Sequence, residues 1–469
     1  MQKPILIGGL GLSLVLALLT RWEASIFDVG EWLFWGAIAL GGLTLWKQKP
    51  SSLVITDTKT PLAKKEVEQA IAKAEQWLET LQLDAPNQDY SPLSKTLDSL
   101  KTQFDRTALT GVITGGRGTG KTSLLRQLAE ATYIDSWTET PPLFTDLASY
   151  DQAAQEQVFA ADLVLFLING DLMASQWETL KHWLQARQRI MLVFNKQDQY
   201  QPEQRQLILE QLRQHVHPAI APSDVMAITA APQGIKVKQI QEDGTVTEFF
   251  EQPEPEITVL ENHLQTLCTD KASQQQLVWS TLWRNAQLVQ HQAKQQLNNR
   301  RRERALPILE KYQWLAAGAT FANPVVALDL LATAAVTGQM IMDVGEIYQQ
   351  KVSLNQAQAI ATAIGKQMVQ LGLVELSTQA IAGILKTNLI TYVAGGAVQG
   401  VSAAYLTHIA GLSLIQYFQE QDPHSPVEGL NIEKLGQILK TMFEQNQRGQ
   451  FLQTFTQNIL TRRSPQAIG

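Results

Sequence analysis

The stretch "TGGRGTGKTS" (Thr114–Ser123) places four glycines immediately before a lysine and a threonine. It fits the pattern G-x-x-x-x-G-K-[ST], which forms a phosphate-binding loop when a strand precedes it and a helix follows it. Glycines let such a loop turn successive backbone N–H groups inward around a polyphosphate. The apolar run "LTGVIT" before the motif and the helical pattern that begins near Lys121 supply that context. The stretch therefore predicts a nucleotide site.

The motif also predicts what its residues do. Lys121 is expected to reach the β and γ phosphates as a point charge, and the Thr122 hydroxyl to coordinate the Mg²⁺ that bridges them. The helix near Lys121 adds the positive end of its dipole. The expected cofactors are a nucleoside triphosphate and Mg²⁺, and the other loop residues expected to hold the phosphates are Gly115, Gly116, Arg117, Gly118, Thr119, Gly120 and Ser123.

Short apolar runs alternate with helical patterns between residues 108 and 230. The runs are "LTGVIT", "PLFTD", "DLVLFLIN", "RIMLVFN" and "VMAIT", and they lack the polar alternation of a half-exposed strand. Such strands indicate a mostly parallel sheet with helices on both faces, which is the α/β fold of a P-loop NTPase. The segment "IKVKQIQEDGTVTEFF" (235–250) alternates with a period near two around Asp243-Gly244 and predicts a β-hairpin appended to this domain.

The stretch "MLVFNKQDQY" indicates which base is bound. It places Asn195, Lys196 and Asp198 directly after an apolar strand. The Asp198 carboxylate can accept hydrogen bonds from both the ring N–H and the amino group of guanine, whereas adenine offers no such donor pair on that edge. Asn195 is expected to bridge the base and the phosphate loop, and Lys196 to cover a face of the base or ribose. The predicted ligands are GTP and GDP.

Together these motifs resemble an Era-like small GTPase of the translation-factor-related class, over residues 108–232. The resemblance implies a G domain that hydrolyses GTP as a molecular switch. It also implies that Asp146 in "FTDLASY" is the aspartate of D-x-x-G, which contacts Mg²⁺ through water. The loop "ITAAP" (228–232) is similar to the family's base-supporting loop, in which Ala230 would offer a backbone N–H.

The family's switch threonine, a further metal ligand, is expected between residues 132 and 140. We place it at Thr138, with Thr132 and Thr140 as alternatives. The chain departs from the family at Ser149, which replaces the glycine of D-x-x-G, and at Tyr150, which stands where many relatives have a water-orienting glutamine. Hydrolysis is then expected to be slow, or to use another group or a second protomer.

Two uncharged runs near the N-terminus, Ile5–Leu19 and Trp32–Trp46, are slightly shorter than the roughly 20 residues that span a bilayer comfortably. Tryptophans lie near their ends, and lysines flank the outer ends. We expect a transmembrane hairpin, with a signal peptide or buried helices as alternatives. The positive-inside rule then places the G domain on the cytoplasmic side of a membrane that the protein crosses more than once. The family resemblance implies that this is the inner membrane of a bacterium.

The region after the proline-rich acidic stretch "EQPEPE" (251–256) is helical and becomes apolar from Trp314. The stretch "WLAAGATFANPVVALDLLATAAVTGQMIMDVGEIYQ" resembles a YcjF-type helical domain of unknown function. We therefore expect an all-α C-terminal domain. The full set of predicted segments is a hairpin (1–49), a helical stalk (50–107), the G domain (108–256), a connecting helix (257–312), the YcjF-like domain (313–420) and an amphipathic tail (421–469).

The apolar segments of this C-terminal domain allow two interpretations. Either they form a soluble bundle that packs through small residues, or they span the membrane, against which Asp329, Asp343 and Glu346 argue. The arginines of "NNRRRERALP" (298–307) would hold anionic headgroups or simply lie on a solvated helix end.

Composition narrows the functional classes. The formal net charge of −6 disfavours nucleic-acid binding, and a lone cysteine, Cys268, suits a reducing compartment. The predicted function is a membrane-associated, Mg²⁺-dependent GTPase whose partners are GTP and the lipid bilayer, and which is compatible with a homo-oligomer. The alternatives are a nucleotide-gated membrane scaffold or remodelling protein with little turnover, and a GTP-gated transport component.

Overall fold

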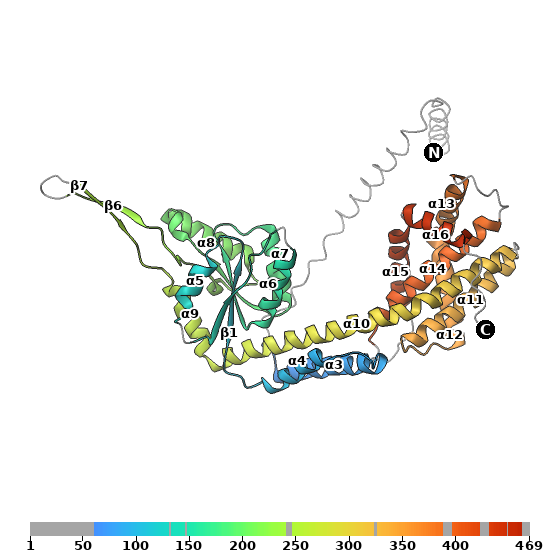
Figure 1. The fold of residues 1–469 in the computed structure, drawn as a ribbon, viewed down its shortest axis with the longest axis horizontal. Coiled ribbons are helices and arrows are strands. Elements are labelled where there is room, and N and C mark those ends of the chain that lie inside the picture. The colour runs from blue at the N-terminus through green and yellow to red at the C-terminus, as the bar shows by residue number, and fades with distance from the viewer. Residues whose placement is uncertain are drawn as a thin grey trace, which may run out of the picture. The chain divides into compact units, whose positions relative to one another are not determined.

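The structure is a computed structural model (Figure 1) that describes residues 61–130, 133–145, 148–240, 246–322, 326–387, 396–422, 431–447 and 449–461. The predicted transmembrane hairpin at 1–49 lies outside these residues. The chain divides into two compact units, Met1–Val67 with Phe104–Arg284 and Glu68–Gln103 with Asn285–Gly469. We call them the sheet unit and the helical unit.

The sheet unit contains a five-stranded sheet in the order β2-β1-β3-β4-β5, in which every neighbouring pair is parallel. This confirms the predicted parallel sheet. All six residues of β3 are buried, as expected for a strand covered on both faces. The strands are β1 (Thr110–Gly115), β2 (Ser136–Glu139), β3 (Leu163–Ile168), β4 (Arg189–Phe194) and β5 (Val225–Ala227).

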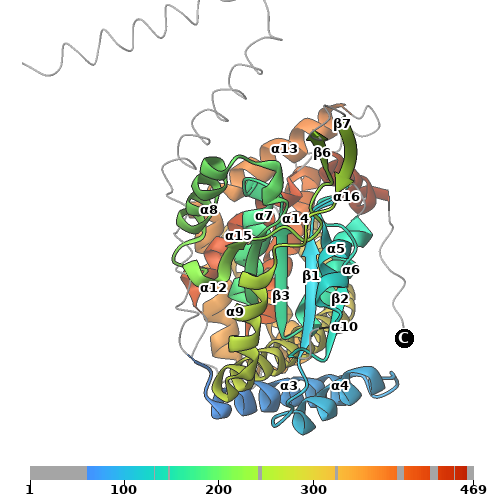
Figure 2. The ribbon, with the colours of Figure 1, turned by 90° about the vertical axis from the view of Figure 1, so that its left-hand side faces the viewer.

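Helices lie on both sides of this sheet (Figure 2). They fill the connections between parallel strands, as crossovers of this kind require. The helices of the sheet unit are α5 (Lys121–Leu128), α6 (Ala148–Ala160), α7 (Ala174–Gln185), α8 (Pro202–Val216), α9 (Thr258–Thr269) and the first part of α10 (Lys271–Ala322).

The second strand differs from the prediction. We expected it at "PLFTD", but β2 is "SWTE", and Leu143 makes only an isolated bridge to Gly116. Pro141 and Pro142 have no N–H to donate to the ladder, so the strand ends before them. Because β2 is an edge strand whose side chains alternate between exposed and half-buried, it lacks the unbroken apolar run that marks β3 and β4.

Buried charges fix the end of the sheet opposite the phosphate loop. Asp162, directly before β3, accepts two hydrogen bonds from the Arg106 guanidinium, at 2.7 and 2.9 Å, and one from the backbone N–H of Thr110 at 2.8 Å. Arg284 of α10 is fully buried and donates to the carbonyls of Phe159 and Ala161. Burial lowers the pKa of Arg284 to about 9, which the charge of Asp162 partly offsets. These contacts hold the start of β1 in place, and the phosphate loop follows that strand.

The helical unit contains one large apolar core, which gathers side chains from α10 to α16. Residues 68–103, expected to form a stalk, contribute α3 and α4 to this unit. The predicted single helix at 257–312 is instead α9 followed, after Asp270, by the continuous α10. The helices are α3 (Lys64–Asp84), α4 (Ser91–Thr102), α11 (Val326–Ile347), α12 (Leu354–Gln370), α13 (Leu373–Thr387), α14 (Gly396–Glu420), α15 (Ile432–Asn446) and α16 (Gly449–Thr461).

Within the described part of the chain, one helix is long and apolar enough to cross a membrane, Val398–Glu420 of α14, and a second if the bent pair of α12 and α13 counts as one span. In this structure 72% of the apolar window of α14 is buried among other residues. A core helix of a soluble bundle has the same properties. The packing therefore places α14 in the core of the helical unit, and whether that unit spans a membrane stays a prediction.

Two arginines of the segment 298–307 form ion pairs with α3 within the helical unit. The Arg301 side chain is 3% exposed, and its Nε lies 3.4 Å from a carboxylate oxygen of Asp84 in α3, which Arg304 also contacts. The Arg301 Nη1 donates to the backbone carbonyl of Tyr348. Arg301 therefore joins α3 to α10 and is not placed to hold a lipid headgroup.

We expect acid to destabilise the helical unit through His408 of α14. Its Nδ1 lies 2.7 Å from Gln313 Nε2 and its ring stacks on Phe451. Burial, and then the charge of Arg302, lower the pKa of His408 to about 4. In the unfolded chain His408 binds a proton near pH 6.5, whereas in the folded chain it stays neutral at that pH. The contribution of His408 to the free energy of unfolding is therefore intact above pH 6.5. It falls by about 3 kcal/mol as the pH drops to about 4.

Urea unfolding of the full chain in detergent, followed by pulse proteolysis at pH 7 and pH 4.5, measures this loss. In His408→Gln, which cannot titrate, the acid-dependent part of the free energy of unfolding should shrink by the same amount. An equal pH dependence in both proteins would show that His408 is not the cause.

Candidate nucleotide-binding site

The phosphate loop lies between the end of β1 and the start of α5. Three of its glycines have positive φ angles, +144° at Gly115, +75° at Gly118 and +93° at Gly120, which only glycine adopts without strain. A Cβ on Gly115 would lie 2.4 Å from the carbonyl oxygen of Leu167 in β3. The glycines therefore serve both the turn of the loop and its close approach to the sheet.

Lys121, the first residue of α5, is 5% exposed and curls back over the loop. Its Nζ donates to the carbonyls of Gly115 at 3.2 Å and Gly116 at 3.0 Å. Burial lowers the pKa of Lys121, and the nearby charge of Glu139 partly offsets this. A desolvated ammonium at the N-terminus of a helix is well placed to attract phosphate oxygens.

Glu139 is the site residue that sequence reasoning missed. It ends β2 and is paired with Ile113 of β1, so its carboxylate reaches the start of α5. The Thr122 hydroxyl lies 2.8 and 3.0 Å from its two oxygens. A hydroxyl and a carboxylate are the hard oxygen ligands that Mg²⁺ prefers, so the donor set fits this ion. The feature that could have identified Glu139 is its position as the acidic residue that ends the strand next to β1.

The structure describes two of the other residues predicted for the metal side, Thr138 and Thr140. Thr138 is in β2 with an exposed side chain, and its role as the switch threonine stays a prediction. Thr140 is buried, and its hydroxyl donates to Thr114 Oγ1 at 2.8 Å. Asp146 and Thr132 lie outside the described residues.

Ser149 and Tyr150, which replace the family's glycine and glutamine, lie in the first turn of α6, and both are exposed. Two further loop residues predicted to hold phosphate, Arg117 and Gly118, are exposed as well, whereas Thr119 is buried.

Asn195 joins the two halves of the site. It directly follows β4 and is 1% exposed. Its Nδ2 donates to the carbonyl of Thr119 at 2.8 Å, and its Oδ1 accepts from the backbone N–H of Ala230 at 3.0 Å. A Cβ on Gly120 would lie 2.2 Å from that Nδ2, so the loop needs a glycine there. Asn195 thus connects the phosphate loop to the segment 228–232.

Asp198 follows a sharp turn at Lys196, whose φ of +62° is left-handed. One carboxylate oxygen of Asp198 accepts from the backbone N–H of Gln233 at 3.2 Å. The other oxygen, Oδ1, is buried and has no hydrogen-bond partner within the described ranges. Since an unpartnered buried carboxylate oxygen is costly, it indicates a ligand that brings N–H donors.

Comparison with known proteins found one family model that matches, over the helical part of the chain. Residues 284–448 match the model of DUF697, a domain of unknown function. No curated protein matches the chain significantly. Among solved structures, the chain is similar to the LeoA bacterial dynamin GTPase from ETEC, at 12% identity over 86% of this chain and 99% of that one, with a TM-score of 0.27.

A second similar structure is that of an oligomerised bacterial dynamin pair described as a mechanism for long-range sensing and tethering of membranes. It is 12% identical over 86% of this chain and 80% of that chain, with a TM-score of 0.24. Residues 284–448 are therefore similar to DUF697, and the site described above lies in the sheet unit that precedes them.

Proposed function

We propose that this protein binds GTP in the sheet unit and hydrolyses it to GDP and phosphate in the presence of Mg²⁺. The observation that carries the proposal is the carboxylate of Asp198, whose buried Oδ1 lacks a donor among the described residues. Guanine supplies two donors on one edge, its ring N–H and its amino group, and adenine does not. Asn195 fixes this carboxylate's loop relative to the phosphate loop.

The phosphates would be held by the backbone N–H groups of residues 115–120 and by Lys121. The buried ammonium of Lys121 binds phosphate oxygens more strongly than an exposed one would, because water screens it less. The N-terminus of α5 adds its dipole to this attraction. The loop therefore orients the triphosphate and neutralises part of its charge.

Thr122 and Glu139 would hold Mg²⁺ at the start of α5, which is the fit suggested by their contact of 2.8 Å. Bound there, the ion would neutralise charge on the β and γ phosphates. Asp146, which the sequence predicts as the acidic residue near Mg²⁺, stays a candidate for this role together with Glu139. The attacking water has no glutamine at position 150 to orient it, so we expect slow turnover.

The remaining parts of the proposal concern the membrane. The uncharged runs at 5–19 and 32–46 would anchor the protein in the bilayer, with the sheet unit on the cytoplasmic side. GTP binding would order the segments around β2, and hydrolysis would release them. The helical unit, the membrane or further copies of the protein would respond to that change.

A second candidate is a nucleotide-gated scaffold with little turnover, which Tyr150 favours because it replaces a water-orienting residue. Multiple-turnover phosphate release from the full chain, with and without liposomes, distinguishes the two functions. We expect slow, Mg²⁺-dependent release that Lys121→Ala abolishes. GTP binding without phosphate release above background would establish the scaffold and exclude the enzyme.

A further inference from the structure

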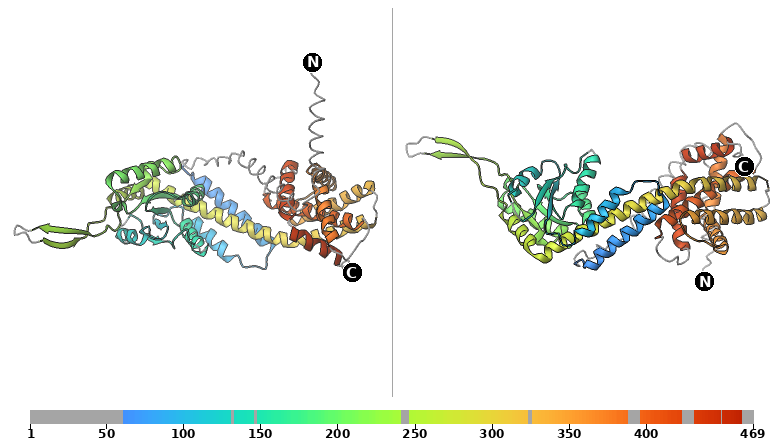
Figure 3. Two further views of the ribbon diagram at one scale, coloured as in Figure 1. Left: turned by 90° about the horizontal axis from the view of Figure 1, so that it is seen from above. Right: turned by 60° about the horizontal axis from the view of Figure 1, so that its bottom comes forward.

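The β-hairpin of the sheet unit forms a second sheet of its own. It consists of β6 (Ile235–Ile240) and β7 (Val246–Glu251), which pair antiparallel and make no ladder with the five-stranded sheet. Figure 3 shows β6 and β7 extending away from the rest of that unit. Within the described residues, the outer edge of each strand is therefore unpaired.

The base of the hairpin is fastened to the nucleotide-binding loops. Gln252 Nε2 donates to the carbonyl of Pro232 at 2.6 Å. Thr229 and Glu256 exchange two backbone hydrogen bonds, at 2.9 and 3.0 Å. Both ends of the hairpin are thus held, so it is a defined projection and not a free linker.

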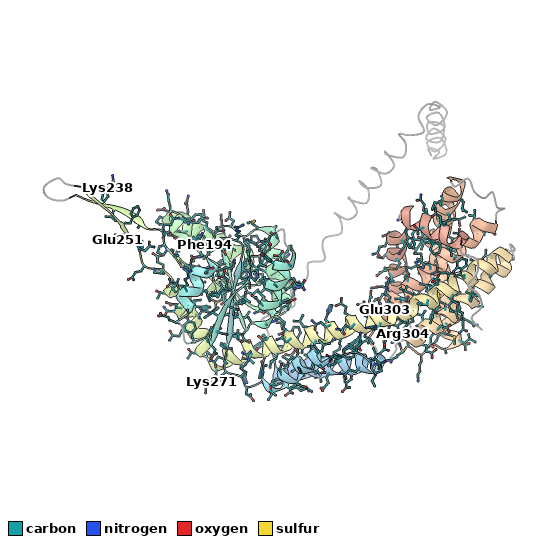
Figure 4. The ribbon with its side chains drawn as sticks, viewed as in Figure 1. Phe194, Lys238, Glu251, Lys271, Glu303 and Arg304 are labelled. Atoms are coloured by element: carbon teal, nitrogen blue, oxygen red, sulfur yellow. The ribbon has the colours of Figure 1, made fainter. Side chains whose placement is uncertain are left out.

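Charge is divided between the two strands. β6 ("IKVKQI") carries lysines at 236 and 238 and no acid, and β7 ("VTEFFE") carries Glu248 and Glu251 and no base. Lys238 Nζ lies 2.9 Å from a carboxylate oxygen of Glu248, with side chains 63% and 39% exposed. Figure 4 shows Lys238 and Glu251 on this projection.

The hairpin also exposes apolar side chains. Ile235 is 56% exposed and Phe250 is 76% exposed. An exposed apolar strand edge recruits other strands unless charge or shape prevents it. In this hairpin, charge opposes only the pairing of a strand with its own kind, because β6 carries only lysines and β7 carries only glutamates.

We propose that the hairpin is an interface between copies of this protein, in which β6 of one copy pairs with β7 of the next. Pairing β6 with β6 would bring lysines together, and pairing β7 with β7 would bring glutamates together, which is unfavourable. A copy displaced sideways along the sheet continues the antiparallel register of the hairpin itself. It places Lys238 of one copy beside Glu248 of the next and covers part of the exposed Phe250 ring.

Such an interface joins two different surfaces, so it does not close at a dimer. Each added copy presents a new β6 edge and a new β7 edge. This interface lies outside the phosphate loop and the base loop, so it does not depend on the proposed GTPase activity.

Single cysteines test the geometry in the full chain, because the native cysteine, Cys268, is buried. A mixture of one protein with Lys238→Cys and another with Glu248→Cys should form a disulfide between copies, since opposed residues of paired strands lie close enough. Lys238→Cys alone should not. Absence of the mixed disulfide, or equal cross-linking by Lys238→Cys alone, would overturn the proposal.

A charge swap tests the same interface without cysteines. K236E/K238E/E248K/E251K should still self-associate but should bind wild type at least roughly tenfold less well, because the cross-copy pair of residues 238 and 248 becomes like-charged. K236E/K238E alone should lose self-association, and nucleotide binding should persist in both variants. If the swapped protein associates equally with wild type, or if K236E/K238E loses only vesicle binding, the hairpin contacts something other than a second copy.

Discussion

Asp198→Asn should change the nucleotide preference of the site from guanine to xanthine. The wild-type carboxylate accepts from the ring N–H and the amino group of guanine, whereas the amide of asparagine offers one acceptor and one donor. Xanthine has a carbonyl in place of the amino group and matches that pattern. Because a charge-assisted pair of hydrogen bonds is lost, GTP affinity should fall on the order of 100-fold.

Equilibrium binding of labelled GTP and XTP to the full chain measures both affinities. Asp98→Asn is the matched control, since it removes the same charge from an exposed position of α4 in the helical unit and should leave both unchanged. If Asp198→Asn binds GTP as wild type does, Asp198 does not contact the base. The unpartnered Oδ1 would then need another donor, and the preference for guanine would lose its main support.

The phosphate loop and the central strands were predictable because their signals are local. A strand buried on both faces must be apolar at every position, as β3 is, and a loop with three positive φ angles must carry glycines. The hairpin was predictable for a similar reason, since alternation around Asp243-Gly244 marked both strands, and the structure has them at 235–240 and 246–251. Each of these features depends on neighbours in sequence.

The second strand was not predictable in the same way. An edge strand needs only one partner, so "SWTE" shows no long apolar run. The stretch "PLFTD" is more apolar, although its proline, like the proline before it, has no N–H to donate to the ladder. The metal ligand predicted from the sequence is Asp146, the acid at the end of that apolar run, and it lies outside the described residues. Only the register of Glu139 beside Ile113 brings the other acid to Thr122.

The make-up of the helical unit depends on contacts that no local pattern encodes. Asp84 of α3 meets Arg301 of α10, 217 residues later. From sequence alone, α3 is an amphipathic helix whose partner is unknown, which is why a stalk was expected. Similarly, small residues and glycines in α14 suit a soluble core as well as a lipid interface, and its sequence does not show which helices bury it.

Glu139→Gln should reduce Mg²⁺-dependent GTP hydrolysis on the order of 100-fold, whereas Asp146→Asn should have a small effect. The amide in Glu139→Gln keeps the size of the side chain and can still accept from Thr122, but it removes the charge that a metal ligand supplies. Phosphate release measured across a range of Mg²⁺ concentrations separates weaker metal binding from slower chemistry. Glu203→Gln, at an exposed acid in the first turn of α8 in the same unit, is the matched control.

The reverse result would be equally informative. If Asp146→Asn abolished hydrolysis and Glu139→Gln did not, the acid that serves the metal would come from the chain after Leu143, and the contact between Glu139 and Thr122 would be one that GTP binding replaces. Because Glu139 ends a strand whose register is fixed by β1, its contact with Thr122 is held by the sheet itself. The two variants therefore decide whether the metal ligand is built into the sheet or delivered by a switch.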